Sequence, residues 1–399
     1  GNNIPDEIAD DDIYYNRITD RSNTEAMRNF HNLFVKNLLI TSVAKRGDTL
    51  IDLAVGKGGD LSKWIEAKLK FVLGIDNSRD NIENRLNGAC ARYLNYRKKT
   101  KLMPRALFVY GNSFLNIRNT NALYTDRGKN IVKAIFGQGA KDSKELGAGV
   151  YKSYGIGAEG FNICSIQFAI HYMFGLQQNL QDFLRNVSET TKVGGYFIGT
   201  SYDGALIFKM LENKKVGESE TIMEDGEKIW EITKQYDHKE FQNDSSCLGY
   251  AIDVYQDTIN KTFREYLVNY TYLTRLLENY GFVLLKQDET KELGLPGSTG
   301  LFRELFGMMM ETKNKNKYGI ARDMTPGQKR ISFLNRYFVY KKVRSVDADK
   351  VSLSLLGQTL DEEKMLEKES EKAESAVKEV ISKQKKSTKK LKKKLILKP

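Results

Sequence analysis

The sequence has few of the residues that build disulfide scaffolds and metal centres. Its 399 residues include three cysteines and three histidines. Cys90, Cys164 and Cys247 show neither CxxC nor Cys/His ligand spacing, so no metal site is expected. Three cysteines cannot all pair with one another, which makes a reducing compartment the simpler expectation.

Long apolar runs and a leader peptide are also missing. No run approaches the roughly 20 apolar residues that cross a bilayer, so an integral membrane protein is not expected. Residues 1–12 are acidic and the first residue is Gly rather than Met. A signal peptide is therefore not indicated, and we interpret Gly1 as an expression remnant or the cut end of a longer polypeptide.

Positive charge is present but concentrated at one end of the chain. The formal net charge is +12, and the last 17 residues, 383–399, hold nine lysines and no acid, which leaves +3 for the rest. Bulk charge is therefore weak evidence for a nucleic-acid partner. Residues 361–380 mix Glu and Lys and predict a solvated helix that leads into this basic tail, with a disordered extension as the alternative.

Short β-rich runs alternate with helical segments before residue 345. The runs lie at 49–55, 71–76, 106–110, 161–168 and 195–201, and the segments between them include 61–69 and 80–99. This alternation predicts an α/β fold with a mostly parallel, doubly wound sheet. Later runs lie at 262–272, 281–287 and 333–342, and we interpret the last two as antiparallel closing strands.

Two further segments complete the expected organisation. Residues 118–160 are rich in glycine and predict an irregular insertion over one rim of the sheet rather than a core element. We therefore expect one domain over 1–345, including that insertion, and a charged helical or disordered tail over 346–399 that is Lys-rich from 383.

The most informative local feature is a strand that runs directly into glycines, Ile51-Asp-Leu-Ala-Val-Gly-Lys-Gly-Gly-Asp60. Glycines there allow close backbone approach to a ligand at the carboxyl end of the first strand. The spacing fits neither GxxxxGK[ST] nor GxGxxG, because Leu61 stands three residues after Gly58. Asp52 and Asp60 would repel phosphate but suit the cationic amine and sulfonium of S-adenosylmethionine. Asp76 follows Gly58 by 18 residues, near the spacing of a carboxylate that holds ribose hydroxyls.

Six motifs together resemble the mRNA cap guanine-N7 methyltransferases, especially those of large DNA viruses. They are Arg28-Asn-Phe-His-Asn-Leu-Phe-Val-Lys36, the glycine loop, Gly111-Asn-Ser-Phe114, Ser165-Ile-Gln-Phe-Ala-Ile-His-Tyr172, Glu265-Tyr-Leu-Val268 and Leu334-Asn-Arg-Tyr337. They follow the family order over about residues 14–342, and QFAIHY with GKGGD is the specific pair. The resemblance implies a Rossmann-like S-adenosylmethionine-dependent methyltransferase with an antiparallel closing strand.

The resemblance also implies a set of cofactor-binding residues. Lys36 would reach the methionine carboxylate, Asp76 the ribose and Asn112 the adenine, where the family usually has Asp. An amide can still accept from the exocyclic amine of adenine and donate to the ring. The full implied set is Lys36, Asp52, Ala54, Gly56, Asp60, Asp76, Asn112 and Gln167. The family's PDAN segment reads Tyr202-Asp-Gly-Ala205 here, and we assign it no role.

A second implied set would bind the capped guanine. Tyr172 would stack on the base, His171 would donate toward the guanine edge, and Glu265 would accept from guanine N1 and the exocyclic amine. The remaining members are Tyr15, Asn32, Lys57 and Tyr337, with Lys57 at the cap triphosphate. A structural histidine at 171, an aromatic core residue at 337 and a solvated turn lysine at 57 are the alternatives to these roles.

The implied reaction is methyl transfer from S-adenosylmethionine to guanine N7 of the GpppN cap of mRNA. N7 has a lone pair and no proton to lose, so we expect proximity and electrostatics rather than a catalytic base. The alternatives are another Rossmann-like methyltransferase, or a non-catalytic RNA-binding or regulatory subunit of a capping complex. No KxDG motif is present, so guanylyl transfer would belong to other capping-enzyme modules; a stimulatory subunit is a further expected partner. The expected location is the cytoplasm, or the viral factory or virion for a viral protein.

Overall fold

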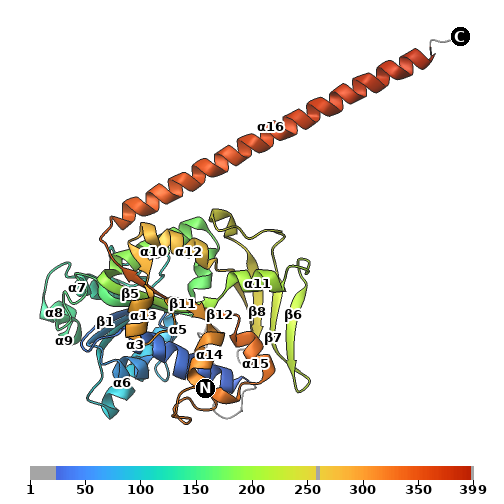
Figure 1. The fold of residues 1–399 in the computed structure, drawn as a ribbon. Helices are drawn as coiled ribbons and strands as arrows, with labels where there is room; N and C mark the ends of the chain where they lie inside the picture. Colours follow the sequence, from blue (N-terminus) through green and yellow to red (C-terminus); the bar gives the residue numbers. More distant parts are fainter. Residues whose placement is uncertain (1–23, 258–260, 397–399) are drawn as a thin grey trace. The chain divides into compact units, whose positions relative to one another are not determined.

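The computed structural model describes residues 24–257 and 261–396, with side chains up to residue 389. Its contacts divide the chain into two units, residues 1–351 and 352–399. Figure 1 shows both sheets in the first unit, whereas the second continues one helix, α16 (Ala348–Ile396). No helix among the described residues is both long and apolar enough to cross a lipid bilayer.

The central sheet has the mostly parallel arrangement that the sequence predicts. Its strands are β1 (Thr49–Asp52), β2 (Phe71–Asp76), β3 (Arg105–Tyr110), β4 (Phe161–Gln167), β5 (Thr191–Tyr202), β10 (Phe282–Leu284), β11 (Thr299–Leu301) and β12 (Asn335–Lys342). Their order is β10-β12-β5-β4-β1-β2-β3, with β11 paired to β12. Strands β1 to β5 pair in parallel and β12 runs antiparallel to β5, which confirms the predicted Rossmann-like fold with an antiparallel strand.

The last two predicted strands pair antiparallel with each other, as expected, but the first of them is shorter than predicted. Residues 281–287 were expected to form an antiparallel closing strand, and β10 pairs antiparallel with β12, which is itself antiparallel to β5. β10 therefore runs in the same direction as β5. Short edge strands carry no directional signal in their own sequence, because direction is set by the connection that precedes them.

The central strands of this sheet are buried on both faces, as expected for a sheet that helices cover on both sides. Leu50 and Ile51, neighbours in β1 that face opposite sides, are both fully buried. The helices before β5 are α2 (Glu25–Asn29), the π-helix η1 (Phe30–Lys36), α3 (Asn37–Val43), α4 (Leu61–Glu66), α5 (Arg79–Glu83), α6 (Ala89–Lys99), α7 (Asp126–Ile135), α8 (Ser143–Leu146), α9 (Ala148–Tyr151), the 3-10 helix η2 (Ile170–Phe174) and α10 (Gln177–Thr190). Those after β5 are α11 (Gly204–Met210), η3 (Ser245–Cys247), α12 (Tyr270–Asn279), α13 (Gln287–Leu293), α14 (Phe302–Met310), η4 (Ala321–Asp323) and α15 (Pro326–Ser332).

The glycine-rich segment 118–160 does contribute to the core, contrary to expectation. Helix α7 begins after Thr125, whose side chain accepts a hydrogen bond from the Gly128 backbone N–H. Val132 and Ile135 in this helix are fully buried. Two residues three positions apart lie on the same face of a helix, so this spacing is compatible with a buried helix. The many glycines in the segment made that helix hard to recognise in the sequence.

A second sheet, inserted between α11 and α12, was largely missed by the sequence analysis. Its antiparallel strands are β6 (Ser219–Glu224), β7 (Glu227–Lys234), β8 (Ala251–Gln256) and β9 (Lys261–Tyr266). The predicted strand over 262–272 ends at Tyr266, because Asn269 accepts a hydrogen bond from the Tyr272 backbone N–H and starts α12. Paired Ile232 and Val254 show the apolar face that holds this sheet in the core.

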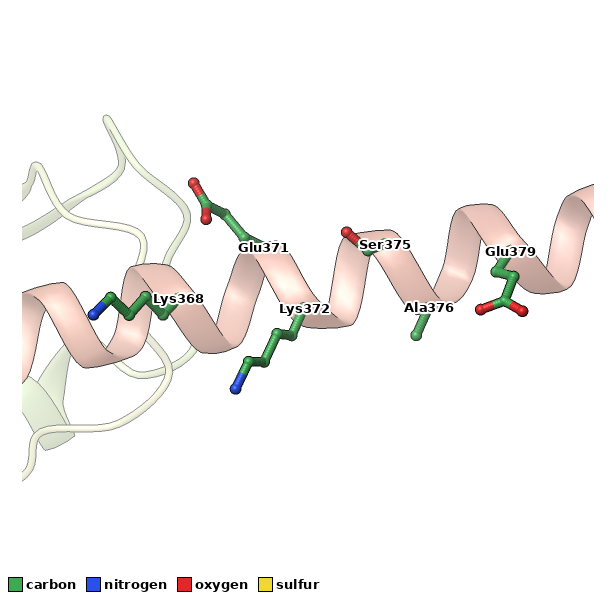
Figure 2. A pocket seen from close by; sticks show the side chains of 6 residues that line it. All are labelled: Lys368, Glu371, Lys372, Ser375, Ala376 and Glu379. Carbon is green, nitrogen blue, oxygen red and sulfur yellow. The ribbon is translucent and has the colours of Figure 1, made fainter.

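From residue 360 to residue 389, every side chain of helix α16 is exposed. A shallow open depression on one of its faces is lined only by exposed side chains, those of Lys368, Glu371, Lys372, Ser375, Ala376 and Glu379. Figure 2 shows these side chains projecting from the helix surface. Pairs one turn apart, such as Glu379 with Lys383 at 2.7 Å, support such a helix weakly. The division into a 1–345 domain and a 346–399 tail stays a proposal.

Candidate active site

Most of the predicted site residues that the structure describes meet at the carboxyl edge of the central sheet, where the strand order reverses. From β1 the chain builds β2 and β3 on one side and then β4 and β5 on the other. In open α/β sheets such a reversal is where ligands bind. The glycine loop follows β1, Asp76 ends β2 and Gln167 ends β4, so three of the predicted segments converge here.

The glycine loop is fastened to the end of β2 by Asp76. One oxygen of this carboxylate accepts from the Gly56 backbone N–H at 2.8 Å. The other accepts from the Ser78 N–H at 2.9 Å and the Asn81 amide at 3.0 Å. Gly56 and Gly58 have φ values of 57° and 77°, which L side chains rarely adopt, so these glycines are required by the backbone. The carboxylate of Asp52 likewise accepts from the Ala54 N–H at 3.0 Å.

Asp60 lies between two buried lysines. Its carboxylate is 3.1 Å from the Lys36 ammonium and 3.0 Å from that of Lys63. Burial opposes ionisation of Asp60, but both ammonium groups outweigh it and hold its pKa at about 2. Lys36 ends the π-helix η1, a local widening that is frequent at functional sites. The structure thus joins predicted residues Lys36 and Asp60, which come from different elements.

Lys63 was not predicted and is the main addition that the structure makes. It lies in α4 and only 3% of its surface is exposed. Its ammonium donates to the side-chain oxygen of Asn32 at 2.6 Å as well as to Asp60. Lysines are rarely buried, so the sequence alone predicts that a lysine in the first turn of a helix lies on the surface. Only the burial seen in the structure identifies Lys63 as a candidate site residue.

Gln167 and Tyr337 lie on one row that crosses three strands. Thr200 in β5 pairs in register with both residues. The Thr200 hydroxyl donates to the Gln167 oxygen at 3.0 Å, and the Gln167 amide donates to the Ser165 hydroxyl at 3.1 Å. Tyr337 is fully buried, and its hydroxyl donates to the Gly297 carbonyl at 3.0 Å. Burial raises the pKa of this hydroxyl, so it stays protonated.

The chain leaves β4 through an unusual backbone conformation at Phe168. Its φ of 53° is rarely adopted by an aromatic residue. The Phe168 N–H donates to the Thr200 carbonyl at 3.0 Å, which holds the turn. Such strain concentrates at functional sites, and here it directs the chain into η2, the helix that carries His171 and Tyr172.

His171 meets Glu265 from the second sheet. The His171 Nε2 lies 3.4 Å from the Glu265 Oε1, and both residues are 5% exposed. Burial lowers the pKa of His171 to about 3, so its ring is neutral at neutral pH. The Tyr172 ring centroid lies 4.2 Å from that of His171. The structure therefore assembles three of the residues expected to bind guanine.

Close packing of β9 against η2 positions Glu265 beside His171. A Cβ on Gly175, just after η2, would lie 2.9 Å from the Tyr266 ring, so only glycine fits there without displacement. Tyr266 follows Glu265 directly in β9. The inserted sheet is therefore part of the site, which the sequence analysis did not foresee.

Three predicted residues stand apart from these groups. Lys57 is fully buried, with its ammonium 3.0 Å from the Asn87 oxygen and 3.5 Å from Asp80, so neither the triphosphate contact nor the solvated-turn alternative matches its position. The Asn112 oxygen accepts from the Phe114 backbone N–H at 2.9 Å, as in a local turn. Tyr15 lies outside the described residues.

Comparisons with known proteins agree on one family. The family described as "mRNA (guanine-N(7))-methyltransferase domain" matches residues 12–343. A probable mRNA-capping enzyme of Acanthamoeba polyphaga mimivirus is 27% identical over 84% of this chain and 28% of its own length. An mRNA cap guanine-N(7) methyltransferase of Arabidopsis thaliana is 29% identical over 71% of this chain and 67% of its own.

A third relative shows the same difference in length. The mRNA-capping enzyme of African swine fever virus is 24% identical over 65% of this chain and 26% of its own length. The chain thus spans about a quarter of the viral relatives it matches and about two thirds of the plant one.

Proposed function

The chain belongs to the mRNA (guanine-N(7))-methyltransferase family, and from this membership we propose that it methylates guanine N7 of the GpppN cap of mRNA. S-adenosylmethionine is the methyl donor of such enzymes and supplies an electrophilic methyl group on a sulfonium. The observation that carries the proposal is the meeting of His171 and Glu265 at the carboxyl end of β4, beside the glycine loop of β1.

The residues around the glycine loop fit this cofactor chemically. Asp52, Asp60 and Asp76 are carboxylates at the ends of β1 and β2 and at the start of α4. Such a set suits an amine, a sulfonium and ribose hydroxyls, and would repel a phosphate group. We assign the ribose to Asp76, the methionyl part to Asp52 and Ala54, and the carboxylate end to Lys36. Gly56, Asp60, Asn112 and Gln167 complete the assigned set.

Glu265 and His171 present complementary groups to a guanine. A carboxylate only accepts hydrogen bonds, which matches the donors at guanine N1 and its exocyclic amine. A neutral imidazole carries one N–H, which matches the acceptor O6. Because burial lowers the pKa of His171 to about 3, the ring offers one donor and one acceptor at neutral pH. Adenine has the opposite pattern on this edge and would be rejected.

The protein's part in the reaction is positioning and electrostatics. Guanine N7 needs no base, because it holds a lone pair and no proton. Glu265 would fix the base in the plane, Tyr172 would stack on it, and the Glu265 charge would favour the positive charge that the base gains. Asn32 would contact the rest of the cap. Tyr337, which is buried, would support the pocket from beneath, and Lys57 keeps a structural position.

Partners and location extend the proposal. The viral relatives are several times longer than the matched region, which supports an association with other capping-enzyme modules or a stimulatory subunit. The proposed location is the cytoplasm, or a viral factory or virion.

A substrate panel tests the proposal. The protein is incubated with labelled S-adenosylmethionine and, separately, GpppA-RNA, uncapped RNA, ATP and small amines. We expect label only in GpppA-RNA. Label in ATP or an amine would indicate another methyltransferase activity. Binding of capped RNA with no label in any substrate would indicate a regulatory subunit.

A further inference from the structure

Helix α16 carries a row of uncharged residues through a highly charged sequence. Eleven of the 22 residues from 366 to 387 are charged. Seven of the uncharged ones follow one another at alternating intervals of four and three residues, and they form a seam: Leu366, Ser370, Ala373, Val377, Val380, Gln384 and Ser387. Such spacing places all seven on one face of a helix, as in a coiled coil. The eleven charged residues all occupy other positions of the repeat.

The seam is uncovered in the described part of the chain. Leu366, Val377 and Val380 are 65%, 57% and 55% exposed. The six side chains drawn in Figure 2 all lie off the seam, and four of them are charged, so the rest of the helix surface is suited to water. A helix in a protein draws most of its stability from packing of such an uncharged face. The seam is therefore a surface that a partner helix can cover.

The two ends of the seam carry opposite charge. Residues 361–374 hold seven acids and three lysines, a net charge of −4, whereas residues 383–399 hold nine lysines and no acid. Packed helices lie about 8–10 Å apart, close to the screening length at physiological salt, so charges on such neighbours interact. Two parallel copies of α16 would set the basic segments side by side. Two antiparallel copies would set each acidic segment beside a basic one.

The seam also matches itself when its direction is reversed. An antiparallel pair centred between Val377 and Val380 sets residues equally far from this centre opposite one another. The facing residues are then Val377 and Val380, Ala373 and Gln384, and Ser370 and Ser387. Apolar side chains meet in the middle, and hydroxyl groups that can both donate and accept meet further out. This register buries no charge.

We propose that α16 pairs with α16 of a second copy of this chain, through the seam, as an antiparallel two-stranded coiled coil. The family match ends at residue 343, so the proposal concerns residues outside the matched region and goes beyond methyl transfer. RNA bound to the lysines of 383–399 is the other occupant to consider. RNA binding would use the lysines but would leave the seam exposed, so the uncharged row favours a helix.

Sedimentation equilibrium of the full chain, treated with nuclease, tests the pairing. We expect the mass to rise from 45.6 kDa to twice that value as the concentration rises to about 100 µM. Val377→Lys should raise the dissociation constant of the dimer at least about 10-fold, because a charge then enters the seam of each helix. Lysine is a good helix former, so the helix itself should persist.

Ser375→Lys is the matched control, because it adds the same charge on the face drawn in Figure 2. It should sediment as wild type does. Wild-type protein that stays monomeric at about 100 µM would overturn the proposal. A dimer that nuclease dissociates would indicate RNA as the occupant and would overturn it too, as would equal effects of the two substitutions.

Cross-linking tests the direction of the helices. Ser370→Cys and Ser387→Cys are treated with a short thiol-reactive cross-linker, separately and as an equal mixture, and compared with wild type, in which Cys90 is half-buried. We expect cross-linked dimer above the wild-type level only in the mixture. Dimer formed by either variant alone, or none in the mixture, would overturn the antiparallel arrangement. Monomeric protein that methylates GpppA-RNA would overturn this pairing and leave the proposed function intact.

Discussion

The Nε2 of His171, in the helix η2, lies 3.4 Å from the Oε1 of Glu265, in the inserted sheet. His171 follows β4 of the central sheet, whereas Glu265 lies in β9 of the inserted sheet. Both residues are 5% exposed, so protein atoms rather than water surround most of each side chain. The inserted sheet therefore supplies the acceptor, and the helix after β4 the donor, that the proposed guanine site requires.

Glu265→Ala should abolish cap methylation while leaving cofactor binding nearly intact. The variant removes the acceptor for two guanine donors, and truncating one partner of a buried charged hydrogen bond costs about 2–5 kcal/mol. We expect kcat/KM on GpppA-RNA to fall at least about 100-fold, as measured by labelled methyl transfer, which corresponds to ~2.7 kcal/mol. Calorimetry should show S-adenosylmethionine affinity within about twofold of wild type.

Thr262→Ala is the matched control for this variant, because Thr262 is an exposed residue of the same strand. It should methylate GpppA-RNA at the wild-type rate. Normal turnover in Glu265→Ala would remove this residue from guanine recognition.

Asp76→Ala should weaken S-adenosylmethionine binding. Besides its proposed ribose contact, Asp76 receives the Gly56 N–H at 2.8 Å, so its loss also releases the glycine loop. We expect the Kd, measured by calorimetry, to rise at least 10-fold, the effect of roughly 1.4 kcal/mol. Asp76→Asn, which keeps an acceptor oxygen, should show a smaller rise. An unchanged Kd in Asp76→Ala would exclude Asp76 from the cofactor site.

The stability of the protein should fall in mild acid because of His171. Burial lowers the pKa of His171 from 6.5 to about 3. Below pH 6.5 the unfolded chain therefore binds a proton that the folded chain does not, and the free energy of unfolding decreases as pH falls toward 3. The contribution of one such histidine reaches at most ~1.4 kcal/mol per pH unit.

Urea unfolding between pH 7 and pH 4.5 measures this dependence. His171→Gln should show a shallower decrease than wild type, whereas His238→Gln, at an exposed position, should follow the wild-type curve. Parallel curves for wild type and His171→Gln would mean that the buried ring does not remain neutral in the folded state.

Lys57→Met should affect stability rather than cap binding. The side chain is fully buried, and its ammonium group lies against the side-chain oxygens of Asn87 and Asp80. Replacing it with methionine removes the hydrogen bond to Asn87 and the ion pair with Asp80. We expect the free energy of unfolding to fall by about 1–3 kcal/mol, with the Kd for GpppA changed less than about threefold. A rise of 10-fold or more in that Kd with unchanged stability would instead place the lysine on the cap triphosphate.

The sequence was most informative where local pattern and position in the chain coincide. The parallel strands could be predicted because each is a short apolar run followed by a helical segment, and Asp52 and Asp76 could be located because they end such strands. The family resemblance contributed Glu265, whose position in an apparent β run gave no information about its partner.

The features that were missed depend on tertiary contacts. The inserted sheet alternates polar and apolar residues weakly, and only its pairing with neighbours buries residues such as Ile232. Lys57 and Lys63 look like solvated lysines in sequence, but both are buried because carboxylate and amide oxygens surround their ammonium groups. The conformation of Phe168 likewise follows from a bond to Thr200 in the neighbouring strand.

Locating the transferred methyl group tests the central claim most directly. GpppA-RNA is incubated with the protein and methyl-labelled S-adenosylmethionine, and the cap is then released by nuclease digestion and compared with methylated standards. The account predicts that all label co-migrates with N7-methylguanosine-capped dinucleotide and that Glu265→Ala yields none. Label at the adenosine, at a ribose oxygen or within the RNA body would contradict it.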